Sequence, residues 1–157
     1  GELCVQGYDV MLGYLNQPEA SAETLRNNWL HTGDLAYMDD EGYIFIVDRS
    51  KDMIILGGEN VYPREVEEVI YTIPEVLECA VVGVDDSLRG QAVCAFIVAK
   101  EGMEIDKKAV RKYLLEHLAL YKVPRHYFVI EKMPKNGTGK IVKPTLREMA
   151  AALVQKV

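Results

Sequence analysis

The chain has 157 residues, of which 49% are hydrophobic and 27% are charged, and its formal net charge is −6. This length and composition allow one globular domain, or one domain with a flanking piece. The acidic balance argues against a nucleic-acid platform, because neutralising phosphates needs clustered Lys and Arg. No run approaches the roughly 20 apolar residues of a membrane span, and the N-terminus has no signal-peptide pattern, so we expect a cytoplasmic protein without a transmembrane segment.

Three cysteines, Cys4, Cys79 and Cys94, are widely spaced and lie in apolar runs. An odd, dispersed set favours reduced, buried thiols over a disulfide framework or a zinc knuckle. The first residues alternate like a strand already under way, without an initiator Met. We therefore expect the chain to be a piece of a longer protein.

Residues 1–50 show the pattern of short strands and turns. A short helix is expected after Pro18, since proline suits a first helical position. The turn-forming residues 39–42 predict a hairpin between Leu35–Tyr37 and Tyr43–Val47, whose ends would face a ligand. This part is expected to be the β-rich edge of a larger domain.

A charged cluster at residues 48–52 separates two apolar strands, and we place a domain boundary between residues 50 and 51. Residues 51–157 are expected to form a compact α+β domain, with a central sheet of about three strands, flanking helices and a small β-ribbon. Periodicity predicts its elements: a helix from Pro63, strands at Val76–Val84 and Ala92–Val98, a helix from Asp106 to about Leu120, a strand at Tyr127–Ile130 and a last helix from about Lys143.

The loop from Lys135 to Lys140 contains two glycines and ends in a positive charge. It fails as a Walker A phosphate loop, since Pro134 stands in place of the first Gly and Ile141 in place of the Mg²⁺-binding Ser or Thr. Two interpretations stay open. The loop is either a solvated turn, or a segment that lies close against a ligand while Lys140 brings a compact charge to a phosphate or carboxylate.

Asp34 follows a glycine at the mouth of a strand, where its carboxylate could accept hydrogen bonds from ribose hydroxyls or simply form a turn. Arg49, at the far end of the predicted hairpin, could reach the same ligand or make a surface ion pair. Gly57 and Gly58 are either a turn or the wall of a narrow tunnel for a chain such as pantetheine.

Neither a metal site nor a self-contained nucleophilic site is indicated. His31, His117 and His126 are far apart in sequence and lack ligand spacing, so we expect no metal held by the protein. The sequence suggests no Ser-His-Asp or Cys-His arrangement.

The order of these motifs resembles the acyl- and aryl-CoA ligase branch of the adenylate-forming superfamily over nearly the whole chain. The stretch from Gly7 to Thr24 resembles the part that precedes the family's ribose-binding motif, and Trp29–Asp34 resembles that motif. Residues 48–67 resemble the hinge and the segment after it. Residues 134–141 resemble the loop with the catalytic lysine.

For the first half-reaction, the resemblance implies that Asp34 and Arg49 hold the ribose of ATP or AMP. Lys140 would contact the carboxylate of the acid and the α-phosphate as the acyl-adenylate forms. Mg²⁺ would arrive with ATP and would not be held by this chain.

For the second half-reaction, the resemblance implies that the small domain rotates about Lys51. Gly57, Gly58 and Glu59 would then line the pantetheine channel, and Arg89 would contact CoA. Lys143 stands where many relatives have Arg, and Arg89 where some have an aromatic residue, so the contacts with CoA are expected to differ from theirs.

The family's phosphate loop and acyl pocket would lie upstream of Gly1, in an N-terminal domain that this chain needs as a partner. We therefore expect the chain alone to be inactive. The acid, fatty or aryl, is not indicated by these residues. Two alternatives remain: an adenylation domain that loads a carrier-protein thiol, and an interaction module without catalysis. The segment from Gly57 to Asn60 resembles that of CoA ligases, which favours CoA over a carrier protein. The presence of Asp34, Arg49 and Lys140 together speaks against the silent module.

Overall fold

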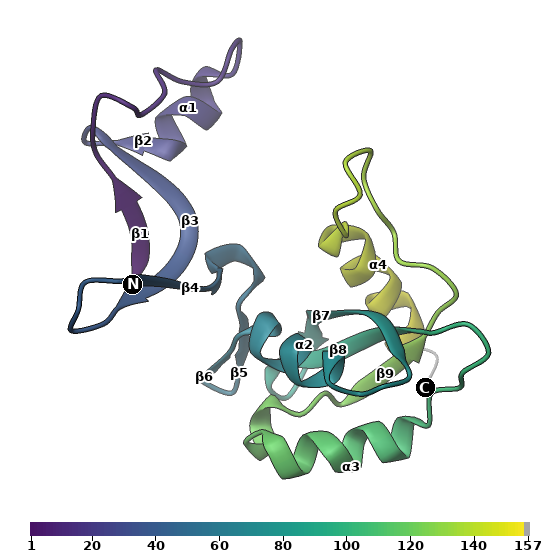
Figure 1. Ribbon diagram of the computed structural model, residues 1–157. Coiled ribbons are helices and arrows are strands. Elements are labelled where there is room, and N and C mark those ends of the chain that lie inside the picture. The colour runs from purple at the N-terminus through teal and green to yellow at the C-terminus, as the bar shows by residue number, and fades with distance from the viewer. Residues whose placement is uncertain (156–157) are drawn as a thin grey trace. The chain divides into compact units, whose positions relative to one another are not determined.

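The computed structural model describes residues 1–155, which divide into one compact unit of residues Gly1–Lys51 and a second that begins at Asp52. Each unit has its own sheet, and the short 3₁₀ helix η1 (Ser50–Asp52) lies at the division (Figure 1).

The first unit is an antiparallel sheet with one short helix. Strand β3 is central and pairs with the three other strands. The carboxylate of Asp39 accepts hydrogen bonds from the backbone N–H groups of Glu41 and Tyr43, which closes the predicted hairpin turn. The helix after Pro18 is also confirmed. The elements are β1 (Glu2–Val5), α1 (Pro18–Thr24), β2 (Leu25–Arg26), β3 (Trp29–Met38) and β4 (Ile44–Arg49).

The second unit is built around strand β8. Strand β7 pairs antiparallel along one edge of β8, while β9 pairs parallel along the other. The β5–β6 ribbon joins the same sheet where Leu56 pairs with Gly90. These are the three-stranded sheet and the ribbon that the sequence predicted. The elements are β5 (Ile54–Leu56), β6 (Glu59–Val61), α2 (Pro63–Tyr71), β7 (Val76–Asp86), β8 (Gly90–Ala99), α3 (Lys107–His117), η2 (Leu120–Lys122), β9 (His126–Val129) and α4 (Lys143–Val154).

The middle parts of strands β7 and β8 are continuously buried, because helices cover both faces of the sheet. One set of alternating side chains, including Val81 and Val93, packs with residues of α2 and α3. The other set, including Val82 and Phe96, packs with Leu146 of α4. Figure 1 shows α3 and α4 on opposite sides of the sheet.

The helix ends follow local chemistry. Pro63 occupies the first turn of α2, as expected for a residue with no N–H to donate. Asp106 caps α3 by accepting a hydrogen bond from the backbone N–H of Lys108 at 2.8 Å. The prediction that α3 continues to about Leu120 was wrong: the helix ends at His117, because Leu118 is extended with φ −129° and ψ 153°.

The cysteines are free thiols, and Cys79 and Cys94 are buried. Burial raises the pKa of both thiols to about 12, so they stay protonated and unreactive at neutral pH. Of the helices in residues 1–155, none has the length and apolar character to cross a bilayer.

The packing of α4 on the sheet predicts how a core substitution changes the stability of the second unit. Leu146 is 0% exposed and Leu88 is 89% exposed. Leu146→Ala should lower the free energy of unfolding by about 2–5 kcal/mol, because it leaves a cavity under α4. Leu88→Ala, the matched control, should change it by no more than about 0.5 kcal/mol. Urea-induced unfolding of both variants measures the difference, and equal effects would show that α4 does not depend on Leu146.

Candidate functional site

The two residues expected at the ribose lie in contact. Asp34 on β3 and Arg49 on β4 occupy paired positions of the hairpin. The Arg49 Nε atom donates a hydrogen bond to Asp34 Oδ1 at 3.0 Å. The two side chains are 27% and 53% exposed respectively, so a ligand can reach both from solvent. The predicted proximity is present, while their role in ribose binding stays a prediction.

A cavity of about 380 Å³ opens beside this pair, and Arg49 and Lys51 both line it. Thr32 and Gly33 line it too. The Thr32 hydroxyl accepts a hydrogen bond from the Asp34 N–H and donates one to the Leu3 carbonyl, which fixes the backbone in front of Asp34. The expected hinge residue, Lys51, is the last residue of the first unit.

Another cluster of the first unit joins residues that the sequence places far apart. Ligand atoms of Glu2, Cys4 and His31 lie within 4.8 Å of one another. His31 Nδ1 is 2.8 Å from Glu2 Oε2 and also 2.8 Å from Arg26 Nη2. The hydrogen bond with His31 lowers the pKa of Glu2. Because a cation here would have to displace the Arg26 guanidinium, we assign no metal to the cluster.

The residues expected to contact CoA lie together in the second unit. Gly57 and Gly58 form the two-residue turn between β5 and β6, with φ +60° and +93°. Glycine is favoured here by these left-handed dihedrals. Crowding is not the reason, since no atom lies within 4 Å of a Cβ placed on either residue. The Gly57 N–H donates a hydrogen bond to the Arg89 carbonyl at 2.9 Å, and Glu59 is exposed on β6. The turn and Arg89 therefore form one local structure.

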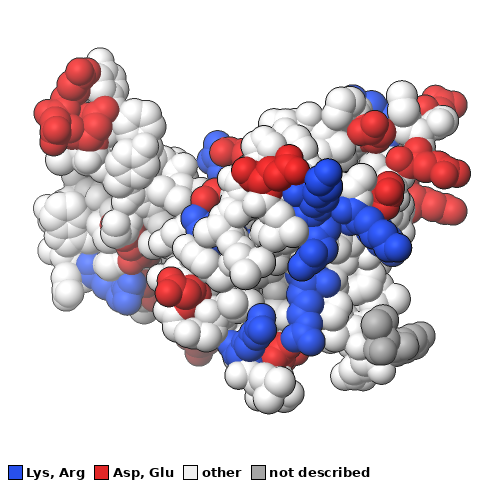
Figure 2. Space-filling model, turned by 90° about the horizontal axis from the view of Figure 1, so that it is seen from below, with Lys and Arg blue, Asp and Glu red and all other residues white. Residues whose placement is uncertain are grey.

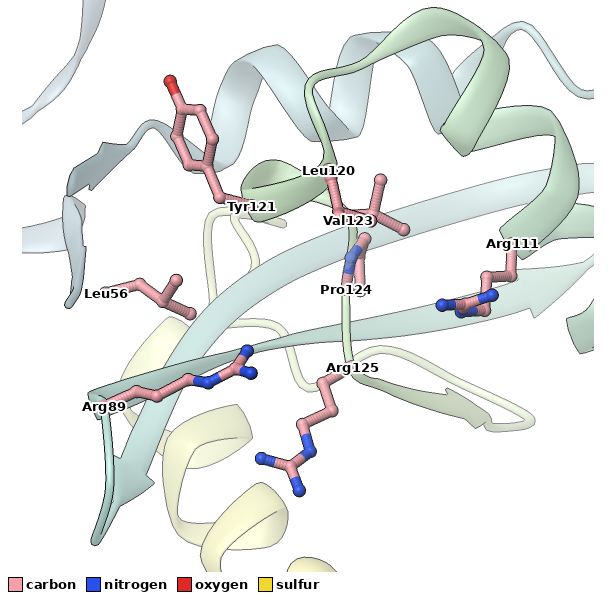
Figure 3. A pocket seen from close by; sticks show the side chains of 8 residues that line it. All are labelled: Leu56, Arg89, Arg111, Leu120, Tyr121, Val123, Pro124 and Arg125. Carbon is pink, nitrogen blue, oxygen red and sulfur yellow. The ribbon is translucent and has the colours of Figure 1, made fainter.

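A pocket of about 750 Å³ lies next to this turn (Figure 3). Three arginines from separate elements line it: Arg89 before β8, Arg111 on α3 and Arg125 before β9. Leu56 and Tyr121 are among its apolar walls. Such a combination suits an anionic ligand with a flat or apolar part.

The charges around this pocket differ in how far they are neutralised. Arg125 Nη1 pairs with Asp86 Oδ2 at 2.9 Å, whereas Arg89 and Arg111 have no ion-pair partner among residues 1–155. Figure 2 shows Lys and Arg side chains gathered in a band on the face seen from below, where α3 lies. This band contrasts with the net charge of −6 of the whole chain.

The loop that ends in Lys140 has a fixed backbone. The side-chain oxygen of Asn136 accepts hydrogen bonds from Thr138 N, Thr138 Oγ1 and Lys140 N, at 3.1, 2.8 and 2.9 Å. The Asn136 N–H in turn donates to the Lys140 carbonyl at 2.9 Å. The Lys140 side chain is exposed, and no partner holds its ammonium group within residues 1–155. The backbone of the loop is therefore fixed, while the ammonium group of Lys140 is exposed to solvent.

Both ends of this loop are attached to the body of the second unit. At the start of the loop, Lys135 pairs with Glu78 of β7. After it, Lys143 pairs with Glu67 of α2 at 2.9 Å, and these two side chains are only 19% and 17% exposed. A partly buried pair in reduced dielectric holds more firmly than an exposed one.

Sequence reasoning missed four residues of these sites: Asn136, Arg111, Tyr121 and Arg125. The signal for Asn136 was available, because an Asn followed by Gly, Thr and Gly is typical of a turn closed by the Asn side chain. The other three come from separate elements, and only the packing of α3, η2 and β9 brings them to Arg89.

Comparisons with known proteins agree with the resemblance. Residues 65–140 match the family described as AMP-binding enzyme C-terminal domain. The long-chain-fatty-acid–CoA ligase of Bacillus subtilis (strain 168) is 48% identical over 148 residues, which are 94% of this chain and 26% of that ligase. The chain therefore spans about a quarter of this relative.

Solved structures give the same result. The o-succinylbenzoate CoA synthetase from Bacillus subtilis, in complex with its acyl-adenylate intermediate, has a TM-score of 0.87 and 39% identity, over 94% of this chain and 30% of that one. The amide bond synthetase McbA from Marinactinospora thermotolerans has a TM-score of 0.86 and 38% identity, over 95% of this chain and 31% of that one. Residues 65–140 thus belong to the AMP-binding enzyme C-terminal domain family, and nearly the whole chain is similar to one part of these adenylate-forming relatives.

Proposed function

We propose that the enzyme containing this chain is an AMP-forming acyl-CoA ligase. In the first half-reaction, a carboxylate oxygen of the acid attacks the α-phosphorus of ATP, and the bond to pyrophosphate breaks. In the second, the sulfur of CoA attacks the acyl carbonyl carbon of the adenylate, loses its proton and releases AMP. Residues 1–50 would belong to the large nucleotide-binding domain, and residues 51–157 would form the mobile domain.

The exposed ammonium group of Lys140 is the observation that supports this proposal most. Negative charge moves toward the pyrophosphate as the acyl-adenylate forms, and a cation fixed in advance stabilises that change at no cost of reorganisation. The hydrogen bonds to Asn136 hold the backbone of the lysine, while its side chain stays available.

Asp34 and Arg49 would position the nucleotide. The hydrogen bond from Arg49 occupies Asp34 Oδ1, which leaves the second carboxylate oxygen to accept hydrogen bonds from the ribose hydroxyls. The arginine would hold the carboxylate in place as well as contact the ribose.

CoA would bind at the glycine turn after the domain rotates about Lys51. A pantetheine chain can lie against the backbone of Gly57 and Gly58, because neither has a side chain. Glu59 would complete the channel wall. Arg89 lies beside the turn and in the arginine-lined pocket, where it would bind a phosphate of the CoA nucleotide.

Adenylate-forming enzymes use Mg²⁺ with ATP. The one three-residue cluster of potential ligands within residues 1–155 offers a His nitrogen and a Cys sulfur, whereas Mg²⁺ prefers oxygen ligands. We therefore propose no Mg²⁺ site at this cluster, and the ion would be brought by ATP. The cytoplasmic location stays a prediction.

The decisive experiment joins the chain to its upstream domain and measures pyrophosphate exchange over a panel of fatty and aryl acids. Exchange should require one class of carboxylic acid, and adding CoA should convert the adenylate to a thioester with release of AMP. If none of the acids supports pyrophosphate exchange, the ligase proposal is wrong. If exchange occurs but only a carrier-protein thiol or an amine captures the acyl group, the acceptor is wrong and the adenylation step stands.

A further inference from the structure

An ion pair ties the residue after the expected hinge to the last helix. Arg147 Nη2 of α4 lies 2.5 Å from Asp52 Oδ1, and the Asp52 side chain is only 12% exposed. Asp52 directly follows Lys51 and is the first residue of the second unit. The pair spans 95 residues of sequence, so it fixes the start of this unit to a distant part of its own core.

Met53 and Ile54, which follow Asp52, show how much the ion pair restrains the backbone after the hinge. Ile54 is 1% exposed and belongs to the core of the second unit, so it is held by packing. Met53 lies between Asp52 and Ile54 and is only partly buried. Without Arg147, the first firmly held residue would be Ile54, and the backbone dihedrals of Asp52 and Met53 would be free to change with those of Lys51.

Helix α4 is itself well placed to act as an anchor. Leu146 and Ala150 are both 0% exposed against the sheet. Lys143, one turn before Arg147, pairs with Glu67 of α2. A residue bound to α4 is therefore bound to the rigid body that also contains the Lys140 loop and the glycine turn.

We propose that Arg147 and Asp52 are positioning residues that confine the domain rotation to Lys51. This inference rests on the proposed ligase function. A hinge with more rotatable residues leaves the small domain with more orientations, of which only two are productive. Because each half-reaction needs one of those orientations, loosening the hinge slows both. In this proposal the pair acts through the geometry of the hinge.

The test uses the enzyme with its upstream domain and follows each half-reaction in a single turnover. Arg147→Met should slow adenylation and the transfer of preformed adenylate to CoA alike, by about 5- to 30-fold. This factor corresponds to the backbone entropy of about one residue, because Asp52 and Met53 would each be freed only in part. The KM for ATP and the amplitude of product per enzyme should not change. Asp52→Asn should also slow both half-reactions, because it removes the charge with which Arg147 pairs.

Three variants serve as controls. Arg147→Lys keeps the charge and should restore most of the rate. The double variant Asp52→Asn/Arg147→Met should be no slower than Arg147→Met alone, because that single variant already removes the contact with Asp52. Glu68→Gln removes a partner of Arg64 from an ion pair whose side chains are 55% and 66% exposed, and should leave both rates unchanged.

The outcomes separate the inference from the ligase proposal. A lower amplitude with an unchanged rate means that Arg147 only supports folding, and the inference is wrong. Unchanged rates, or a change in one half-reaction alone, also overturn it. A wild-type enzyme that exchanges pyrophosphate with none of the acids overturns the ligase proposal, and the inference falls with it.

Discussion

Lys140→Ala should lower acid-dependent pyrophosphate exchange by about 10²–10³-fold, the typical effect of removing one group that stabilises charge in a transition state. The expectation follows from the geometry of the loop. Its backbone is held by Asn136, so a variant loses the ammonium group without losing the loop. The KM for ATP should change little, since Asp34 and Arg49 would still hold the ribose.

The second half-reaction gives the sharpest check on this role. In the proposed mechanism Lys140 has moved away when CoA attacks, so transfer of preformed acyl-adenylate should keep nearly its full rate in Lys140→Ala. Lys132→Ala, which removes another exposed lysine nearby, should leave both steps unchanged. Lys140→Arg should restore little, because a planar guanidinium does not replace a compact ammonium. Normal exchange in Lys140→Ala would show that this lysine is not the catalytic one.

Gly58→Ala should have the opposite pattern: exchange is kept, and transfer to CoA falls by up to about 10²-fold, as expected when a reacting chain is misplaced by about 1 Å. The added methyl group would intrude on the pantetheine channel, and the φ of +93° at this position disfavours a residue with a Cβ. The assay is the single-turnover capture of adenylate at varied CoA concentrations.

Gly102→Ala is the matched control for the backbone effect. Gly102 has φ +74° and lies in the turn after β8, and a Cβ on either glycine would have no atom within 4 Å. Both variants should therefore lose similar stability, about 1–2 kcal/mol for a left-handed residue that gains a Cβ. Equal losses of CoA transfer in the two variants would mean that the effect is strain alone, and that the glycine turn does not line the channel.

Periodicity predicted most of the second unit because its sheet is buried on both faces. The apolar runs that became β7 and β8 and the apolar stripes of α2 and α3 are local signals of burial. The same signal misplaced the predicted end of α3. Leu118 continues the apolar stripe, although its backbone is already extended. A local pattern cannot report where a helix gives way to a 3₁₀ turn.

Contacts between segments that are distant along the chain could not be predicted from the sequence. Nothing near Asp52 indicates Arg147, and nothing near Arg89 indicates Arg111 or Arg125, since each partner is chosen by the packing of whole elements. The proximity of Asp34 and Arg49 was predictable because a single hairpin joins them and its turn residues set the pairing.

The attachment of the Lys140 loop at both ends has a consequence for protein engineering. Lys135 is tied to β7 and Lys143 to α2, and α2 directly follows the ribbon that contains the glycine turn. The Lys140 loop and the proposed acceptor channel are thus parts of one structural unit. Recombination between relatives should treat everything from Asp52 onward as indivisible, because a crossover inside it would combine a loop from one parent with anchor points from the other.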